Sequence, residues 1–162
     1  ILFPHLWEHH YGKFAAFYVA NCLFKTKQFD KAREGYAKFI NEAGNESAEL
    51  KSVAENNIAQ TYDAEGKLDE AAAAYKKIYE TPEGVFKDQA LYMQAEIAQR
   101  QGKKDDAVKL YNELLEKFPQ TELKAQVEKM LTILGAPKPE PKLDAKLDAA
   151  KKKADANKKE AK

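Results

Sequence analysis

The sequence is poor in cysteine and in long apolar runs and has almost no net charge, and each of these shortages excludes a class of structure or of partner. Cys22 is the only cysteine among 162 residues, so no disulfide can form within the chain. No stretch approaches the roughly 20 uninterrupted apolar residues of a membrane-spanning helix. The formal net charge of +1 gives no strong field that would collect nucleic acid or anionic lipid. With 162 residues, the chain is long enough to fold around one apolar core.

Motifs for catalysis and metal binding are also missing. There is no glycine-rich phosphate loop, and no histidine follows His10 to act as a base for Cys22. His5, Glu8, His9 and His10 lie close together in the sequence, but a metal site needs three or four ligands and a supporting second shell. We expect these histidines to be solvated and Cys22 to be buried as a small apolar group. The sequence predicts a protein that is not an enzyme and has no catalytic residues, no metal and no cofactor.

One short phrase occurs three times, each time with an alanine four positions before a tyrosine. The phrases contain Ala32 with Tyr36, Ala71 with Tyr75, and Ala107 with Tyr111. Their alanines are 39 and then 36 residues apart, and a period of roughly 20–50 residues is typical of stacked helical repeats. Gly66 and Gly102 precede the second and third phrases, where a helix can end in a left-handed turn.

Apolar residues at helical spacing predict an all-α chain of three helix pairs and one last helix. The expected helices are 13–26, 29–43, 48–64, 68–80, 86–100, 104–117 and 122–134. Residues 13–135 then form the repeat domain. Residues 1–12 are expected to be the end of a truncated preceding repeat, because Phe3-Pro4 matches Phe118-Pro119. Residues 136–162, rich in proline, lysine and alanine, are expected to be a disordered tail.

With these residues in register, the chain resembles the tetratricopeptide repeat family. The third copy matches best, at Ala95, Gly102, Ala107, Tyr111, Leu114, Leu115 and Pro119. The resemblance implies an α-solenoid of three helix pairs plus a C-terminal capping helix, wound as a right-handed superhelix. It also implies a non-catalytic adaptor whose first helices line a concave groove for a peptide or helix of another protein. Small alanines, such as Ala20 and Ala59, would let these helices approach closely.

On this resemblance, ten side chains of the first helices would face the groove: Phe17, Asn21, Phe24, Asn56, Asn57, Gln60, Tyr92, Glu96, Gln99 and Arg100. Carboxamides offer both a donor and an acceptor to the main chain of a peptide, and aromatic rings supply rigid contact area. The alternative is that the aromatic side chains simply belong to the core.

The sequence allows more than one cellular location and more than one kind of partner. Residues 111–126 are similar to the repeat endings of bacterial cell-envelope proteins, which implies a periplasmic or membrane-associated place, with the cytoplasm as the alternative. We expect a protein or peptide partner, no small-molecule substrate and no nucleic acid. A self-assembling scaffold is one alternative function. Binding of a membrane surface or a nucleic acid through the basic tail is another. A membrane anchor upstream of Ile1 also remains open.

Overall fold

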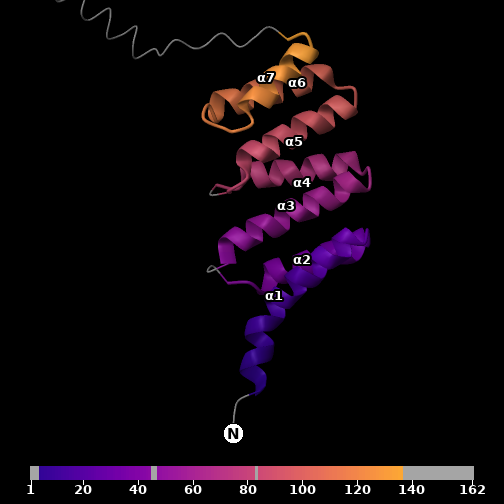
Figure 1. Ribbon diagram of the computed structural model, residues 1–162, viewed down its shortest axis with the longest axis vertical. Coiled ribbons are helices and arrows are strands. Elements are labelled where there is room, and N and C mark those ends of the chain that lie inside the picture. The colour runs from indigo at the N-terminus through magenta and orange to yellow at the C-terminus, as the bar shows by residue number, and fades with distance from the viewer. Residues whose placement is uncertain (1–3, 45–46, 83, 137–162) are drawn as a thin grey trace, which may run out of the picture.

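The computed structural model describes residues 4–44, 47–82 and 84–136, and for residues 4–11 and 13 it describes the backbone alone. Within these ranges the chain is all-helical, with seven helices stacked in chain order along the long axis (Figure 1). Their bounds are α1 Pro4–Lys25, α2 Phe29–Glu42, α3 Ala48–Ala64, α4 Leu68–Glu80, α5 Lys87–Arg100, α6 Lys104–Lys117 and α7 Lys124–Ile133. The predicted fold class, an α-solenoid of helix pairs, is confirmed. The hand of its superhelix stays a prediction.

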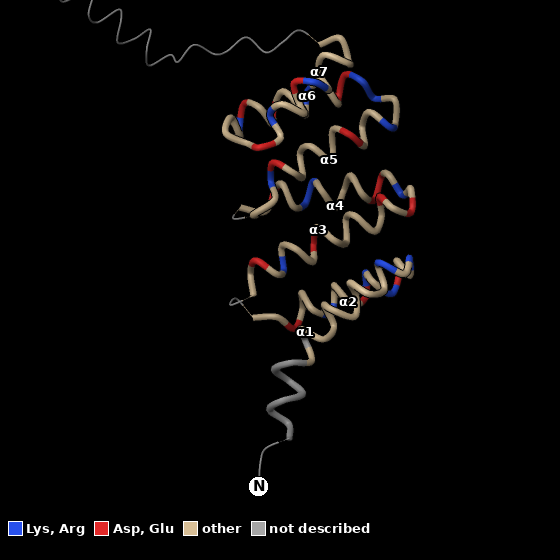
Figure 2. Tube along the Cα trace, viewed as in Figure 1, with Lys and Arg blue, Asp and Glu red and all other residues tan. Residues whose placement is uncertain are grey.

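Each helix packs mainly against its neighbours in the chain. The second helix of each pair is amphipathic, because its apolar residues recur at i, i+3, i+4 and i+7. In α2 this spacing buries Ala32, Tyr36 and Phe39 between α1 and α3. Charged residues lie at the turns on both sides of the stack, inside the pairs and between them (Figure 2). The core is therefore a column of apolar layers, with charge concentrated where the chain reverses.

Small residues set the distance between helices, as the sequence predicted. The alanines of the first helices (Ala20, Ala59, Ala95) and of the second helices (Ala32, Ala71, Ala107) have no exposed surface, and the three repeat tyrosines are at most 1% exposed. The helices also approach closely at Gly35 of α2, where an added Cβ would lie 2.9 Å from the Ala20 Cβ of α1. Larger side chains at such positions force helices apart, typically at 1–3 kcal/mol.

The turns inside the second and third pairs use glycine for its backbone freedom. Gly66 and Gly102 have φ values of 75° and 76°, which confirms the predicted left-handed helix ends. Lys27 takes the corresponding place in the first pair with a φ of 59°. Only glycine adopts this conformation without steric strain, so the first turn is the strained member of the set.

The chain ends differ from the expectations in one respect. Helix α1 begins at Pro4, nine residues before the predicted start, because proline is compatible with the first turn of a helix. The proposal that residues 1–12 end a truncated repeat stays a prediction. The predicted tail beyond Ala136 lies outside the described residues. In the described part of the chain, no helix is both long and apolar enough to cross a membrane.

Candidate functional site

The first helices and α7 are linked along one side of the stack, which we call the first-helix face. Asn57 of α3 donates from Nδ2 to Oδ1 of Asn21 in α1, at 3.2 Å. Arg100 of α5 forms an ion pair with Asp63 of α3. These bonds join helices that are not consecutive in the chain, so α1, α3 and α5 lie beside one another on this face.

The face continues onto the last helix. Gln126 of α7 donates from Nε2 to the Tyr92 hydroxyl at 2.7 Å, and Tyr92 in turn donates to Oε1 of Glu96 at 2.7 Å. Thr121, just before α7, donates to Oδ2 of Asp88 at 2.7 Å. Burial and the neighbouring Glu96 carboxylate raise the pKa of the Tyr92 phenol. The phenol therefore stays protonated and able to donate at physiological pH.

Three of the predicted groove residues are core residues instead. Phe17, Asn56 and Tyr92 are 6%, 7% and 5% exposed, so a partner cannot cover them from outside. The Phe17 ring lies 5.1 Å from the Phe39 ring, centroid to centroid. All three stand one helical turn before the alanine at which the helices approach closely, and that spacing points them inward. The alternative reading of core aromatics is correct for Phe17 and Tyr92.

Three further predicted residues are half-buried and already engaged. Asn21 accepts hydrogen bonds from the Tyr36 hydroxyl, at 2.7 Å, and from Asn57. The Phe24 ring packs against Phe29, with ring centroids 5.8 Å apart. Asn21 and Asn57 thus link the first two pairs, while Phe24 packs within the first pair.

The remaining predicted residues are the ones best placed to meet a partner. Gln60 and Gln99 are half-buried, and neither side chain has a hydrogen-bond partner among the described residues. Arg100 is exposed and turned toward Asp63, while Glu96 accepts the Tyr92 hydroxyl. All ten predicted residues therefore lie on the first helices, but they differ in state. Some are buried in the core, some bond to neighbouring side chains, and Gln60 and Gln99 are the amides without a bond among the described residues. Their role in binding stays a prediction.

Sequence reasoning missed a cluster between α2 and α3. Arg33 is only 12% exposed in its side chain, bonds to the Thr61 hydroxyl at 3.0 Å, and forms an ion pair with Glu65. Its guanidinium lies 4.3 Å above the Tyr62 ring centroid. The bond from Arg33 lowers the pKa of the Glu65 carboxyl. One available signal was the Asp30–Arg33 spacing of three, which places both residues on the same side of α2.

The expected chemistry of Cys22 needs a correction. Its side chain is exposed, because no described element packs on that side of α1. The side chains of His5, Glu8, His9 and His10 lie outside those described, so the prediction of solvated histidines is not tested. Among the described residues, no three histidine, cysteine or carboxylate side chains gather where they could hold a metal.

Comparison with known proteins agrees with this architecture. The family model for the tetratricopeptide repeat-like domain matches residues 5–136, which include α1 from its second residue and all of the other six helices. No curated protein sequence matches the chain. The matched region, the stacked helix pairs and the repeated alanine–tyrosine spacing lead to one conclusion: the chain belongs to the tetratricopeptide repeat-like family.

Proposed function

We propose that the chain is a non-catalytic adaptor that holds a segment of another protein against its first-helix face. Domains of this family typically act in protein interactions, and proteins are accordingly the general class of partner. The observation that carries the proposal is the pair of amides, Gln60 and Gln99, on α3 and α5. Each is free of hydrogen-bond partners among the described residues.

A peptide segment suits such a surface for a chemical reason. A carboxamide can donate to a main-chain carbonyl and accept from a main-chain N–H at the same time. Two amides on neighbouring helices can therefore grip an extended backbone or the open end of a helix. Arg100 lies beside them on α5, but its charge is already paired with Asp63, so the amides are the main polar groups on offer to a partner.

Affinity capture with matched variants tests this proposal. The double variant Gln60→Ala, Gln99→Ala removes both free amides without touching the alanine layers. The control is Lys38→Ala, Lys76→Ala, which shortens two exposed side chains on α2 and α4. Partners recovered from the native cells by the unmodified chain should be lost with the first variant and kept with the control. Equal recovery with both variants would refute the role of the first-helix face.

We place this adaptor in a bacterial envelope complex, on the periplasmic side or at the membrane. Support comes from the sequence ending of residues 111–126, which is similar to that of envelope repeat proteins. Fractionation of the native cells, with protease added to intact and to opened cells, checks the location. The location would be contradicted if the chain resists the protease in cells whose outer layer has been opened, as a cytoplasmic marker protein does.

One observation favours self-assembly as a second candidate function. Tyr18 and Val19 of α1 are 64% and 56% exposed, and the run from Phe14 to Phe24 contains no charged residue. The exposed Ala15 and Cys22 correspond to positions that are fully buried in the later pairs: Ala54 and Thr61 in α3, and Ala90 and Ile97 in α5. An uncharged, exposed apolar surface of this kind marks a place where another repeat or another chain packs. A second copy can cover it symmetrically.

Sedimentation velocity over a concentration series tests self-assembly. Tyr18→Glu should shift the chain toward monomer, because a symmetric interface would bring two like charges together. Ile133→Glu is the matched control, since Ile133 on α7 is 61% exposed at the other end of the stack. A monomer at every concentration, or an equal effect of both substitutions, would exclude assembly through α1.

A further inference from the structure

Two successive junctions of the stack are built from equivalent positions but are filled differently. The first junction is formed by α2, α3 and α4. There the Arg33 guanidinium lies 4.3 Å above the centroid of the Tyr62 ring. Arg33 is held there by Thr61 and Glu65. This junction is closed by side chains of the chain itself, an aromatic ring with a cation above it.

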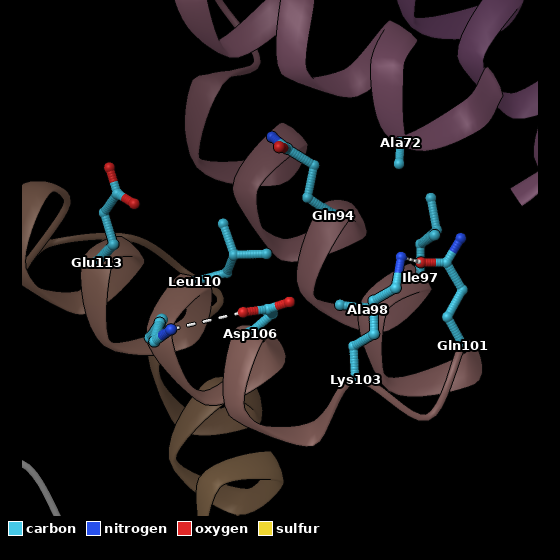
Figure 3. A pocket seen from close by; sticks show the side chains of 10 residues that line it. Ala72, Gln94, Ile97, Ala98, Gln101, Lys103, Asp106, Leu110 and Glu113 are labelled. Atoms are coloured by element: carbon cyan, nitrogen blue, oxygen red, sulfur yellow. Dashed lines mark hydrogen bonds and ion pairs between the residues drawn. The ribbon is translucent and has the colours of Figure 1, made fainter. Parts of the chain in front are cut away.

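At the next junction, both large side chains are replaced by methyl groups. The repeat spacing of 39 residues carries Arg33 to Ala72 in α4, and the spacing of 36 carries Tyr62 to Ala98 in α5. A hollow of about 430 Å³ lies there, between α4, α5 and α6. Ala72, Ile97 and Ala98 line it together with Leu110 from α6 (Figure 3). The hollow thus coincides with the place that a ring and a guanidinium occupy one junction earlier.

The rim of the hollow is polar, but its carboxylates are already paired. Asp106 has Lys109 at 3.5 Å, and Glu113 has Lys117 at 2.8 Å. Glu113 also accepts the Tyr79 hydroxyl at 2.6 Å. The methyl and methylene groups of the floor favour an apolar occupant, and the paired rim offers little to an ionic one.

We infer that this hollow receives an aromatic side chain, tyrosine or phenylalanine, from a protein partner. The bound ring takes the position that the Tyr62 ring takes at the preceding junction and contacts the half-buried Ala72 and Leu110, with the buried Ile97 and Ala98 forming the floor beneath it. The site lies between the second helices, so it is separate from the first-helix face and does not depend on Gln60 or Gln99. An aromatic side chain supplies much contact area with few rotatable bonds, which suits a shallow site.

The chain provides its own closing variants. Ala98→Tyr restores the ring of the preceding junction, and Ala72→Arg restores the guanidinium above it. Either should fill the hollow, so the test survives if one variant folds poorly. Ala125→Tyr on α7 is the control, because Ala125 is exposed and remote from the hollow. Thermal unfolding of each variant establishes that the stack is intact.

The first measurement uses p-cresol, the side-chain analogue of tyrosine, in a titration followed by amide NMR shifts. The unmodified chain and Ala125→Tyr should show saturable shifts centred on Gln94, Ala98 and Leu110. The dissociation constant should rise at least tenfold in Ala98→Tyr or Ala72→Arg. Cyclohexanol should bind at least threefold more weakly than p-cresol. Shifts that do not saturate, that persist in both closing variants, or that are equal for cyclohexanol would overturn the inference.

The second measurement tests the partner's chemistry directly. A displayed library of random peptides is selected on the unmodified chain and depleted on Ala98→Tyr. The surviving peptides should share one aromatic position, and replacing that residue by alanine should weaken binding at least tenfold. Survivors without a common aromatic, or no enrichment at all, would contradict an aromatic ligand. Binding that depends on Gln60 and Gln99 but not on Ala98 would support only the first-helix face.

Discussion

At the scale of single residues, the stack depends on where the chain has no side chain or only a methyl group. Gly66, Gly102 and Lys27 occupy corresponding turns with positive φ, yet only two of the three are glycine. The sequence predicted the two glycines because their conformational role is specific to that residue type. It could not predict that Lys27 adopts the same turn, because lysine has no preference for a positive φ.

Paired glycine substitutions should have opposite effects on stability. A Cβ added at Gly102 meets no atom within 4 Å, so the penalty of Gly102→Ala comes only from its φ of 76°. We expect a loss of about 1 kcal/mol. Gly12→Ala, in the interior of α1 and equally free of contacts, should gain about 0.5–1 kcal/mol. Urea unfolding measures both. No loss at Gly102 would contradict the role of the turn, and a loss at Gly12 would contradict its place in the interior of a helix.

The three buried tyrosines differ in what their hydroxyls do. The Tyr36 hydroxyl donates to Asn21, whereas among the described residues the Tyr75 and Tyr111 hydroxyls find no hydrogen-bond partner. Tyr36→Phe should therefore cost about 1 kcal/mol, while Tyr111→Phe should be neutral or stabilising. Urea midpoints of the two variants at neutral pH provide the comparison. The ranking fails if Tyr111→Phe is the more damaging change.

Alkaline pH should lower the free energy of unfolding through the buried Tyr111 phenol. Burial raises the pKa of Tyr111 from its ordinary 10 to about 12. The unfolded chain then loses this proton before the folded chain does, so the stability present below pH 10 falls as the pH rises toward 12. Tyr111→Phe should reduce that fall, measured as the slope of unfolding free energy against pH. An unchanged slope would show that folding does not raise the pKa of Tyr111.

At the scale of helices, periodicity predicted most of the bounds. Helices α3, α4 and α6 begin and end where expected, since a glycine or a polar link punctuates the pattern on each side. The start of α1 was missed because residues 1–12 were assigned to the end of a preceding repeat, although a glycine inside a helix, such as Gly12, costs only about 1 kcal/mol. The burial of Phe17, Asn56 and Tyr92 was predictable from their spacing to the alanines.

The exposed side of α1 makes Cys22 reactive in the folded protein. Its thiol should react with Ellman's reagent in native buffer at a rate within about tenfold of that of a small free thiol. The same rate in denaturant and in buffer would confirm that folding does not shield it. Strong protection at micromolar protein concentration, relieved by Tyr18→Glu, would instead indicate that a second copy covers α1.

At the scale of the whole molecule, the repeat predicted the order of the helices but not the differences between junctions. The alanine–tyrosine register is local and repeats in the sequence, so it could be found there. The Arg33–Tyr62 closure and the hollow at Ala72 and Ala98 each join residues about 26–29 positions apart on different helices. Such pairs become visible only when the helices are stacked.

Site-specific photo-crosslinking measures the central claim, that a protein segment lies on the first-helix face. A photoreactive benzoylphenylalanine is placed singly at Gln60, Gln99, Lys38 or Lys76 of the chain in its native cells. Discrete adducts with another protein should form from Gln60 and Gln99 and not from Lys38 or Lys76. Adducts from the lysine positions alone, or none from either glutamine, would contradict the claim.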